Sequence, residues 1–154
     1  METIIASAIA VVGTLLGSGI TLAFQQRTID RGNQFTRREK LRQERLDACS
    51  AYAGALINYR RCLVHLWFCE HEQPPPEEPD IVRIRAYDLR SQAQEALFRV
   101  QMLTDDQALS RAAEAVLTDI TALPKMETRA DLDERRVRTR DEVSGFVSAS
   151  KHHL

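Results

Sequence analysis

The sequence lacks the motifs on which most enzymatic sites are built. It has no glycine-rich phosphate loop, no Gly-x-Ser-x-Gly elbow, no Cys-x-x-Cys pair and no His-Glu-x-x-His motif. The acidic pairs Glu77-Glu78 and Asp105-Asp106 fall in a loop or at a helix start, where carboxylates complement the helix dipole without a catalytic duty. We therefore expect a protein that is not an enzyme and that uses no cofactor.

Cysteine is scarce, and its number is odd. Three cysteines cannot form a complete set of intrachain disulfides, so a reducing cytoplasm suits them. On one helix Cys62, His65 and Cys69 lie at i, i+3 and i+7 and share a face, but a zinc site needs a fourth ligand, and His71 falls on the opposite side. We expect an ordinary helix face and no metal. The alternative is a membrane-tethered, metal-dependent sensor or enzyme that uses Cys62, His65 and Cys69.

Charge is absent from the 22 positions between Thr3 and Phe24. A helix of that length spans about 33 Å, enough to cross a hydrocarbon core of about 30 Å. A cleaved signal peptide fits poorly, because it needs bases ahead of an apolar core of about 7–15 residues, and here Glu2 precedes a longer core. A buried helix of a soluble protein is the second rival. We predict an uncleaved transmembrane anchor over residues 1–25.

Bases gather directly after this apolar stretch. Seven bases face three acids between Gln25 and Arg45. The five that we assign to the membrane surface and to topology are Arg27, Arg31, Arg37, Arg38 and Lys40. The positive-inside rule then predicts a single-pass protein of the cell membrane, with its N-terminus outside and a cytoplasmic body of about 130 residues. The bases also suit anionic headgroups of the lipid bilayer, at about 1 kcal/mol each.

The same segment argues against direct nucleic-acid binding. Its acids are interleaved with its bases, and Phe35 is its one aromatic residue. We predict a basic juxtamembrane stalk over residues 26–45 and a cytoplasmic helical bundle over residues 46–154.

Proline is confined to two places, Pro74–Pro79 and Pro124, and the runs between them show helical periodicity with no competing strand signal. The sequence predicts an all-α protein: a single N-terminal transmembrane helix continuing into a long stalk helix, then an antiparallel bundle of about four helices. The first helix is expected to end near Glu70. The later ones are expected at Asp80–Leu103, after the capping signal Thr104-Asp105-Asp106, and at about 130–150.

Apolar residues at alternating spacings of three and four give the expected core-facing seams. The seam of the first helix is Leu46, Cys49, Ala53, Leu56, Arg60, Leu63 and Trp67. The seam of the second is Val82, Ala86, Leu89, Ala93, Ala96, Val100 and Leu103. The third offers Leu109, Ala113, Val116, Ile120 and Leu123, and the fourth Leu132, Val137, Val143, Phe146 and Val147.

Within the apolar stretch, Gly13 and Gly17 match the small-xxx-small motif through which membrane helices approach closely. A parallel pair of stalk helices would bury those seam residues that the bundle itself does not bury. These two glycines are therefore our candidates for self-association of the membrane helix, and a homo-oligomer is the expected assembly.

The run from Gly13 to Leu56 resembles the start of the KilB proteins, a kil-type family of small membrane proteins from actinobacterial conjugative plasmids. The likeness rests on Gly-Thr-Leu-Leu-Gly-Ser from Gly13, on Phe24-Gln-Gln-Arg, and on Arg37-Arg-Glu-Lys-Leu-Arg-Gln-Glu-Arg-Leu46. Phe98–Leu103 also resembles the family. The resemblance implies a membrane-associated factor of plasmid transfer or spread whose unregulated production harms the host, with no catalytic residues to carry over.

These observations favour a non-enzymatic membrane protein. Its cytoplasmic bundle would act as a scaffold or interaction module for an unidentified cytoplasmic protein, and the resemblance implies that this partner belongs to the transfer machinery. Its other expected partners are the bilayer and a second copy of itself.

Overall fold

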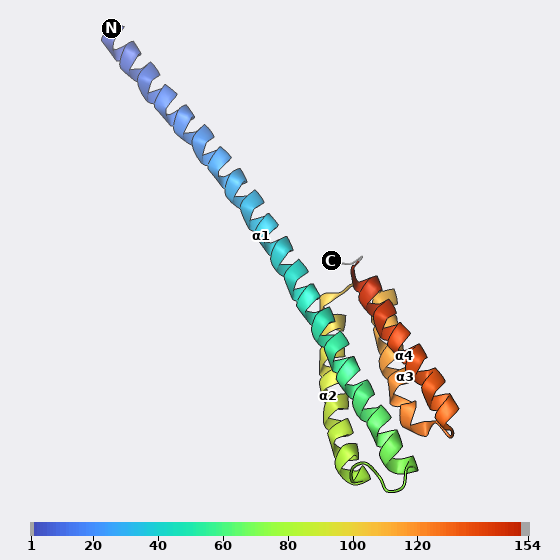
Figure 1. The fold of residues 1–154 in the computed structure, drawn as a ribbon. Coiled ribbons are helices and arrows are strands. Elements are labelled where there is room, and N and C mark those ends of the chain that lie inside the picture. The colour runs from blue at the N-terminus through green and yellow to red at the C-terminus, as the bar shows by residue number, and fades with distance from the viewer. Residues whose placement is uncertain (1, 152–154) are drawn as a thin grey trace. The chain divides into compact units, whose positions relative to one another are not determined.

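The structure, a computed structural model, describes the backbone of residues 2–151 and the side chains of residues 34–151. All regular elements of the described backbone are helices: α1 (Glu2–His71), α2 (Pro79–Leu103), α3 (Gln107–Thr121), the 3-10 turn η1 (Leu123–Lys125) and α4 (Arg129–Ser150) (Figure 1). The predicted all-α class is confirmed. The chain divides into two compact units, Met1–Leu41 and Arg42–Leu154, and we call the second unit the bundle.

The predicted membrane helix concerns residues whose side chains the structure does not describe. Thr3–Phe24, with Gly13 and Gly17, lies outside the described side chains, as do Arg27 and Arg31. Among the residues that are described, no helix carries a stretch apolar and long enough to cross a bilayer. Arg37, Arg38 and Lys40 are described, and all three side chains are exposed. The anchor therefore stays a prediction.

Local signals explain where each helix of the bundle begins. Pro79 opens α2 at the first helical position, where its missing N–H costs nothing. Asp106 caps α3, since its carboxylate accepts from the Ala108 and Leu109 amides at 2.6 and 3.3 Å. Thr128 caps α4 in a reciprocal capping box with Asp131. The predicted helix limits agree with these ends to within about two residues.

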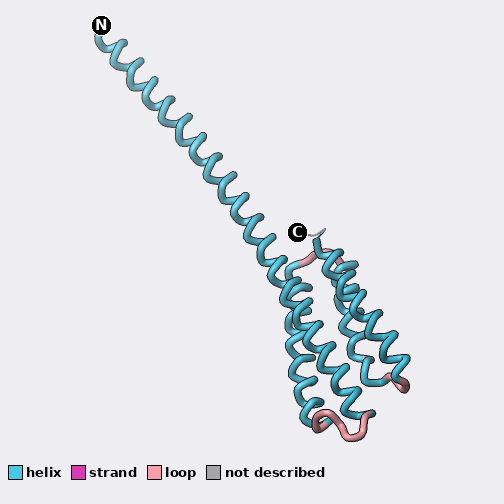
Figure 2. Tube along the Cα trace, viewed as in Figure 1, coloured by secondary structure: helices cyan, strands magenta, loops and turns pink. Residues whose placement is uncertain are grey.

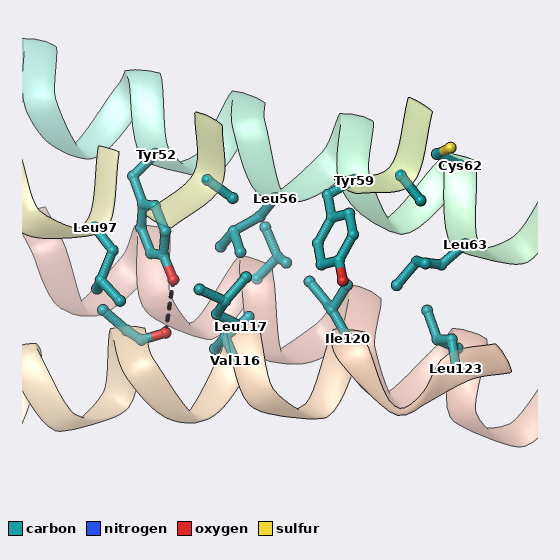
Figure 3. Close-up of a cluster of buried hydrophobic side chains, with 14 of the residues drawn as sticks. Tyr52, Leu56, Tyr59, Cys62, Leu63, Leu97, Val116, Leu117, Ile120 and Leu123 are labelled. Carbon is teal, nitrogen blue, oxygen red and sulfur yellow. Dashed lines mark hydrogen bonds between the residues drawn. The ribbon is translucent and has the colours of Figure 1, made fainter. Parts of the chain in front are cut away.

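The helices of the bundle run alternately up and down, with α2 returning beside α1 and α4 beside α3 (Figure 2). Tyr52 connects three of them: its hydroxyl donates to the Ala113 carbonyl of α3 at 2.8 Å, and its ring meets Phe146 of α4 edge-on at 5.3 Å. Leu56, Tyr59 and Leu63 continue the same face of α1 toward Ile120 and Leu123 (Figure 3). The core therefore lies along one face of α1 and is shared by all four helices.

The predicted seam of the third helix is right, because four of its residues in α3 and Leu123 in η1 are all buried. The predicted seams of α1 and α4 are partly wrong. Leu46, Val137 and Val147 are exposed. On α4 the buried face follows Leu132, Thr139, Val143, Phe146 and Ser150 instead. Thr139 and Ser150 tolerate burial because their hydroxyls donate to the carbonyls of Arg135 and Phe146, each at 2.8 Å.

Candidate functional site

The end of the bundle formed by the C-terminal part of α1 and the α1–α2 loop carries a polar cluster. Nε2 of His65 lies 3.1 Å from a carboxylate oxygen of Glu77 and 3.6 Å from the Cys69 sulfur. Arg85 of α2 donates to the same carboxylate at 2.7 and 3.3 Å. These hydrogen bonds from Arg85 and His65 lower the pKa of Glu77. The cluster ties the loop to both helices that it joins.

This geometry does not assemble the metal site considered from the sequence. The Cys62 thiol is buried and points instead to the Val82 carbonyl, 3.7 Å away, and burial raises its pKa, which disfavours the thiolate that a metal needs. His71 stacks on Trp67 with ring centroids 4.2 Å apart. In the part of the chain that the structure describes, no three His, Cys, Asp or Glu side chains are placed to hold an ion. The alternative that uses Cys62, His65 and Cys69 therefore finds no support.

Arg60 interrupts the predicted apolar seam of α1, and the structure shows how the bundle accommodates it. Its guanidinium donates to the Thr139 hydroxyl at 3.0 Å and to the Arg136 carbonyl, both on α4. Burial lowers the pKa of Arg60, and the nearby Arg136 and Arg140 lower it further. Arg60 therefore fastens α1 to α4, a structural role that explains a base on a core-facing seam.

A second polar network joins α3 to α4. Asp119 accepts from Arg135 and from Arg138, each at 3.0 Å, and Arg138 also donates to Glu142 at 2.9 Å. The other Glu142 oxygen is buried and finds no donor among the described residues. Burial raises the pKa of Glu142, and its neighbour Asp119 raises it further. The hydrogen bond from Arg138 opposes this rise in the pKa, but the surroundings as a whole favour the neutral form of Glu142 more than water does.

The Glu142→Gln variant is expected to be as stable as the parent at pH 7, or more stable by up to about 1 kcal/mol. The raised pKa means that Glu142 contributes stability below its unfolded pKa and loses that contribution as the pH rises through the folded value. Unfolding free energies at pH 7 and pH 5 check this, and the advantage of the variant should shrink at pH 5. Asp119→Asn, which disturbs two arginines at once, should destabilise the bundle. A loss larger than about 1 kcal/mol for Glu142→Gln at pH 7 would contradict the assignment.

A groove of about 290 Å³ runs between α2 and α3. Leu97 and Leu117 form its apolar part, and Arg90, Glu114 and Lys125 bring both signs of charge to its rim. The buried side-chain atoms without a hydrogen-bond partner in the described residues belong to Arg135 and Glu142, away from this lining.

The outward face of α2 is the most apolar exposed helix surface of the bundle. Ile84, Tyr87, Phe98 and Met102 are between 54% and 79% exposed, and we call these four residues the α2 stripe. Large apolar side chains gathered on one face are typical of a contact surface. The predicted seams did not include the stripe. The signal was present in the spacing of Phe98 and Met102, which share a face as i and i+4.

Comparison with known proteins identifies a family. The family model described as KilB plasmid transfer protein matches residues 46–154. No curated protein and no solved structure matches the chain. The resemblance inferred from Gly13–Leu56 is confirmed, although the match covers the bundle and overlaps that run only from Leu46 onward.

Proposed function

Because the chain belongs to the KilB plasmid transfer protein family, we propose that it is a non-enzymatic, membrane-anchored factor of plasmid transfer whose helical bundle binds another protein. The observation that carries the proposal is the family match over residues 46–154. The matched residues lie in the bundle, the unit that has its own core and exposes the α2 stripe.

Three features support a binding role over a catalytic one. Polar side chains such as Arg60, Asp119 and Glu77 fasten parts of the bundle to one another. The groove between α2 and α3 gathers no convergent catalytic groups. The α2 stripe offers apolar area at the surface, where a protein partner, a second copy of this chain included, gains free energy by burying it.

Genetic complementation tests the proposal. Deleting the gene from a conjugative plasmid that encodes this chain should lower transfer frequency, and the parent chain supplied in trans should restore it. A variant with the α2 stripe made polar, Tyr87→Ser with Phe98→Ser, should restore less while remaining folded by circular dichroism. Full restoration by this variant would show that plasmid transfer does not need the α2 stripe. Unchanged transfer on deletion would overturn the proposed function itself.

The proposed topology has the N-terminus outside the cell and the bundle in the cytoplasm, because the bases follow the uncharged stretch Thr3–Phe24. A reporter that is active only in the cytoplasm, fused after Leu154, should be active, and a reporter that needs export should be silent at the same position. The opposite result would reverse the orientation. A mature protein that begins beyond residue 8 would show that the apolar segment is cleaved.

Self-association through the membrane helix is part of the same proposal. If Gly13 and Gly17 form the contact, the double variant Gly13→Ile and Gly17→Ile should lose it, because two branched side chains separate the helices while insertion is preserved. Crosslinking of the full chain in membranes, with fractionation as the control for insertion, measures both properties. An oligomer of unchanged size in the double variant would move the contact elsewhere.

A further inference from the structure

The α2 stripe continues along the helix as a regular seam. Ile84, Tyr87, Ser91, Gln94 and Phe98 follow one another at spacings of three and four, and Met102 extends the same face. The core residues Val82, Ala86, Ala93, Leu97 and Val100 lie on another face of α2. Between the two faces, the half-buried Gln94 borders the groove toward α3. α2 therefore has two seams, and the bundle covers one of them.

We propose that α2 pairs in parallel and in register with α2 of a second copy of this chain, burying the α2 stripe of each. The parallel direction rests on the proposed function, because two chains anchored in one membrane enter their bundles in the same direction. The parallel arrangement would place Ile84, Tyr87 and Phe98 each against its own counterpart, as in a two-stranded coiled coil.

Charge complementarity selects a second copy as the occupant. In a parallel pair, a residue on one flank of the seam faces the residue five positions later on the other helix. Arg90 and Glu95 have this spacing on opposite flanks, so two symmetric Arg90–Glu95 pairs would form. Among the described residues neither one forms an ion pair within its own chain. Both remain available to a partner.

The adjoining heptad repeats the pattern. Arg83 and Asp88 are also five residues apart on the same two flanks. Arg83 is already held by Glu70 and Asp80, each at 2.7 Å, so this pair would compete with contacts inside the chain. The proposed pairing therefore depends mainly on Arg90 and Glu95.

The size of the surface predicts a contact that needs the membrane. Each chain brings four large apolar residues to the α2 stripe, and the polar Ser91 and Gln94 interrupt it, so we expect a contact of low intrinsic affinity. Anchoring raises the effective concentration of the two bundles, which compensates for weak intrinsic affinity. We expect the pair to form in membranes and to dissociate in dilute detergent.

Disulfide trapping of the full chain in its membrane tests direction and register together. A single Tyr87→Cys variant should give a crosslinked dimer on mild oxidation, because the two positions face each other in a parallel pair. The unmodified chain sets the background from the native thiols, and Ser148→Cys, exposed on α4, is the matched control. Trapping at residue 87 should exceed the control by about tenfold.

An antiparallel pair gives a different result. Tyr87 would then lie opposite Phe98, so neither single variant would trap alone and a mixture of Tyr87→Cys with Phe98→Cys chains would. That outcome would overturn the proposal, as would equal trapping at Ser148→Cys and Tyr87→Cys.

Charge reversal in the Tyr87→Cys chain tests the pairing residues. Arg90→Glu alone and Glu95→Arg alone should each reduce trapping by about tenfold, since like charges then face each other twice. Mixing the two differently tagged chains should restore trapping between them, a result that misfolding cannot produce. Arg111→Glu, at an exposed site on α3, should change nothing. Unchanged trapping in both single reversals would overturn the proposal.

Fractionation of the same samples keeps the two proposals separate. Chains that stay in the membrane yet fail to trap would overturn the α2 pair and leave the proposed function standing. Chains that trap while in the soluble fraction would overturn the anchor and leave the pair standing.

Discussion

Val12→Arg is expected to release the chain from the membrane. Val12 lies in the middle of the uncharged stretch Thr3–Phe24, where a base costs about 2.5–3.5 kcal/mol on insertion scales. That free energy corresponds to a change of about a hundredfold in the insertion equilibrium. Fractionation with alkaline extraction measures the result, and the bundle should remain helical because the substitution lies outside it.

Two matched variants make this result specific. Val12→Leu keeps the stretch apolar and should stay in the membrane. Thr28→Arg adds the same base on the side already rich in arginine and should also stay there. A Val12→Arg chain that resists extraction as well as the parent would contradict the transmembrane assignment.

Leu63→Ala is expected to lower the free energy of unfolding by about 2–5 kcal/mol. Leu63 is 4% exposed and lies in the core toward Leu123, so truncation leaves a cavity that the neighbouring side chains fill poorly. Leu89 is only partly buried at the edge of the same core, so Leu89→Ala should cost less. Denaturant unfolding of the full chain, followed by circular dichroism, measures both.

The control for this series is a residue on the exposed face of α2. Ile84 is 65% exposed, so Ile84→Ala should stay within about 0.5 kcal/mol of the parent when the chain is monomeric. Equal losses for Leu63→Ala and Ile84→Ala would show that the assignment of inner and outer faces is wrong.

The sequence predicts the helix limits of the bundle well because the signals that set them are local. Pro79 at the start of α2 and the capping residues Asp106 and Thr128 act on their own turns. The family was also predictable, mainly from the run Gly13–Leu56 and from Phe98–Leu103, whereas the family match covers residues 46–154.

Helix faces were harder to predict, because burial depends on partners far along the chain. Tyr52 and Tyr59 were left out of the predicted seam, yet both are buried with hydroxyls that reach Ala113 and Thr121 on α3. On α4, Val137 is exposed although it is apolar, while Thr139 is buried because its hydroxyl is satisfied locally. Hydropathy alone cannot distinguish such cases.

The polar contacts of the site were equally hard to predict, because they depend on how the chain folds back on itself. His65 was noticed for its place between Cys62 and Cys69, but its contact with Glu77 depends on how the α1–α2 loop folds back. Glu77 in turn meets Arg85 eight residues later on another helix. No periodic pattern relates residues in a loop to residues on two helices.

The most direct test of the account is the plasmid transfer frequency supported by a bundle that has lost its anchor. We would measure it in cells that carry a deletion of the gene and express either the parent chain or the Val12→Arg chain at equal levels, with helicity confirmed for both. We expect the parent chain to restore transfer and the Val12→Arg chain to leave it at the level of the deletion. Equal restoration by the two chains would contradict a membrane-anchored transfer factor.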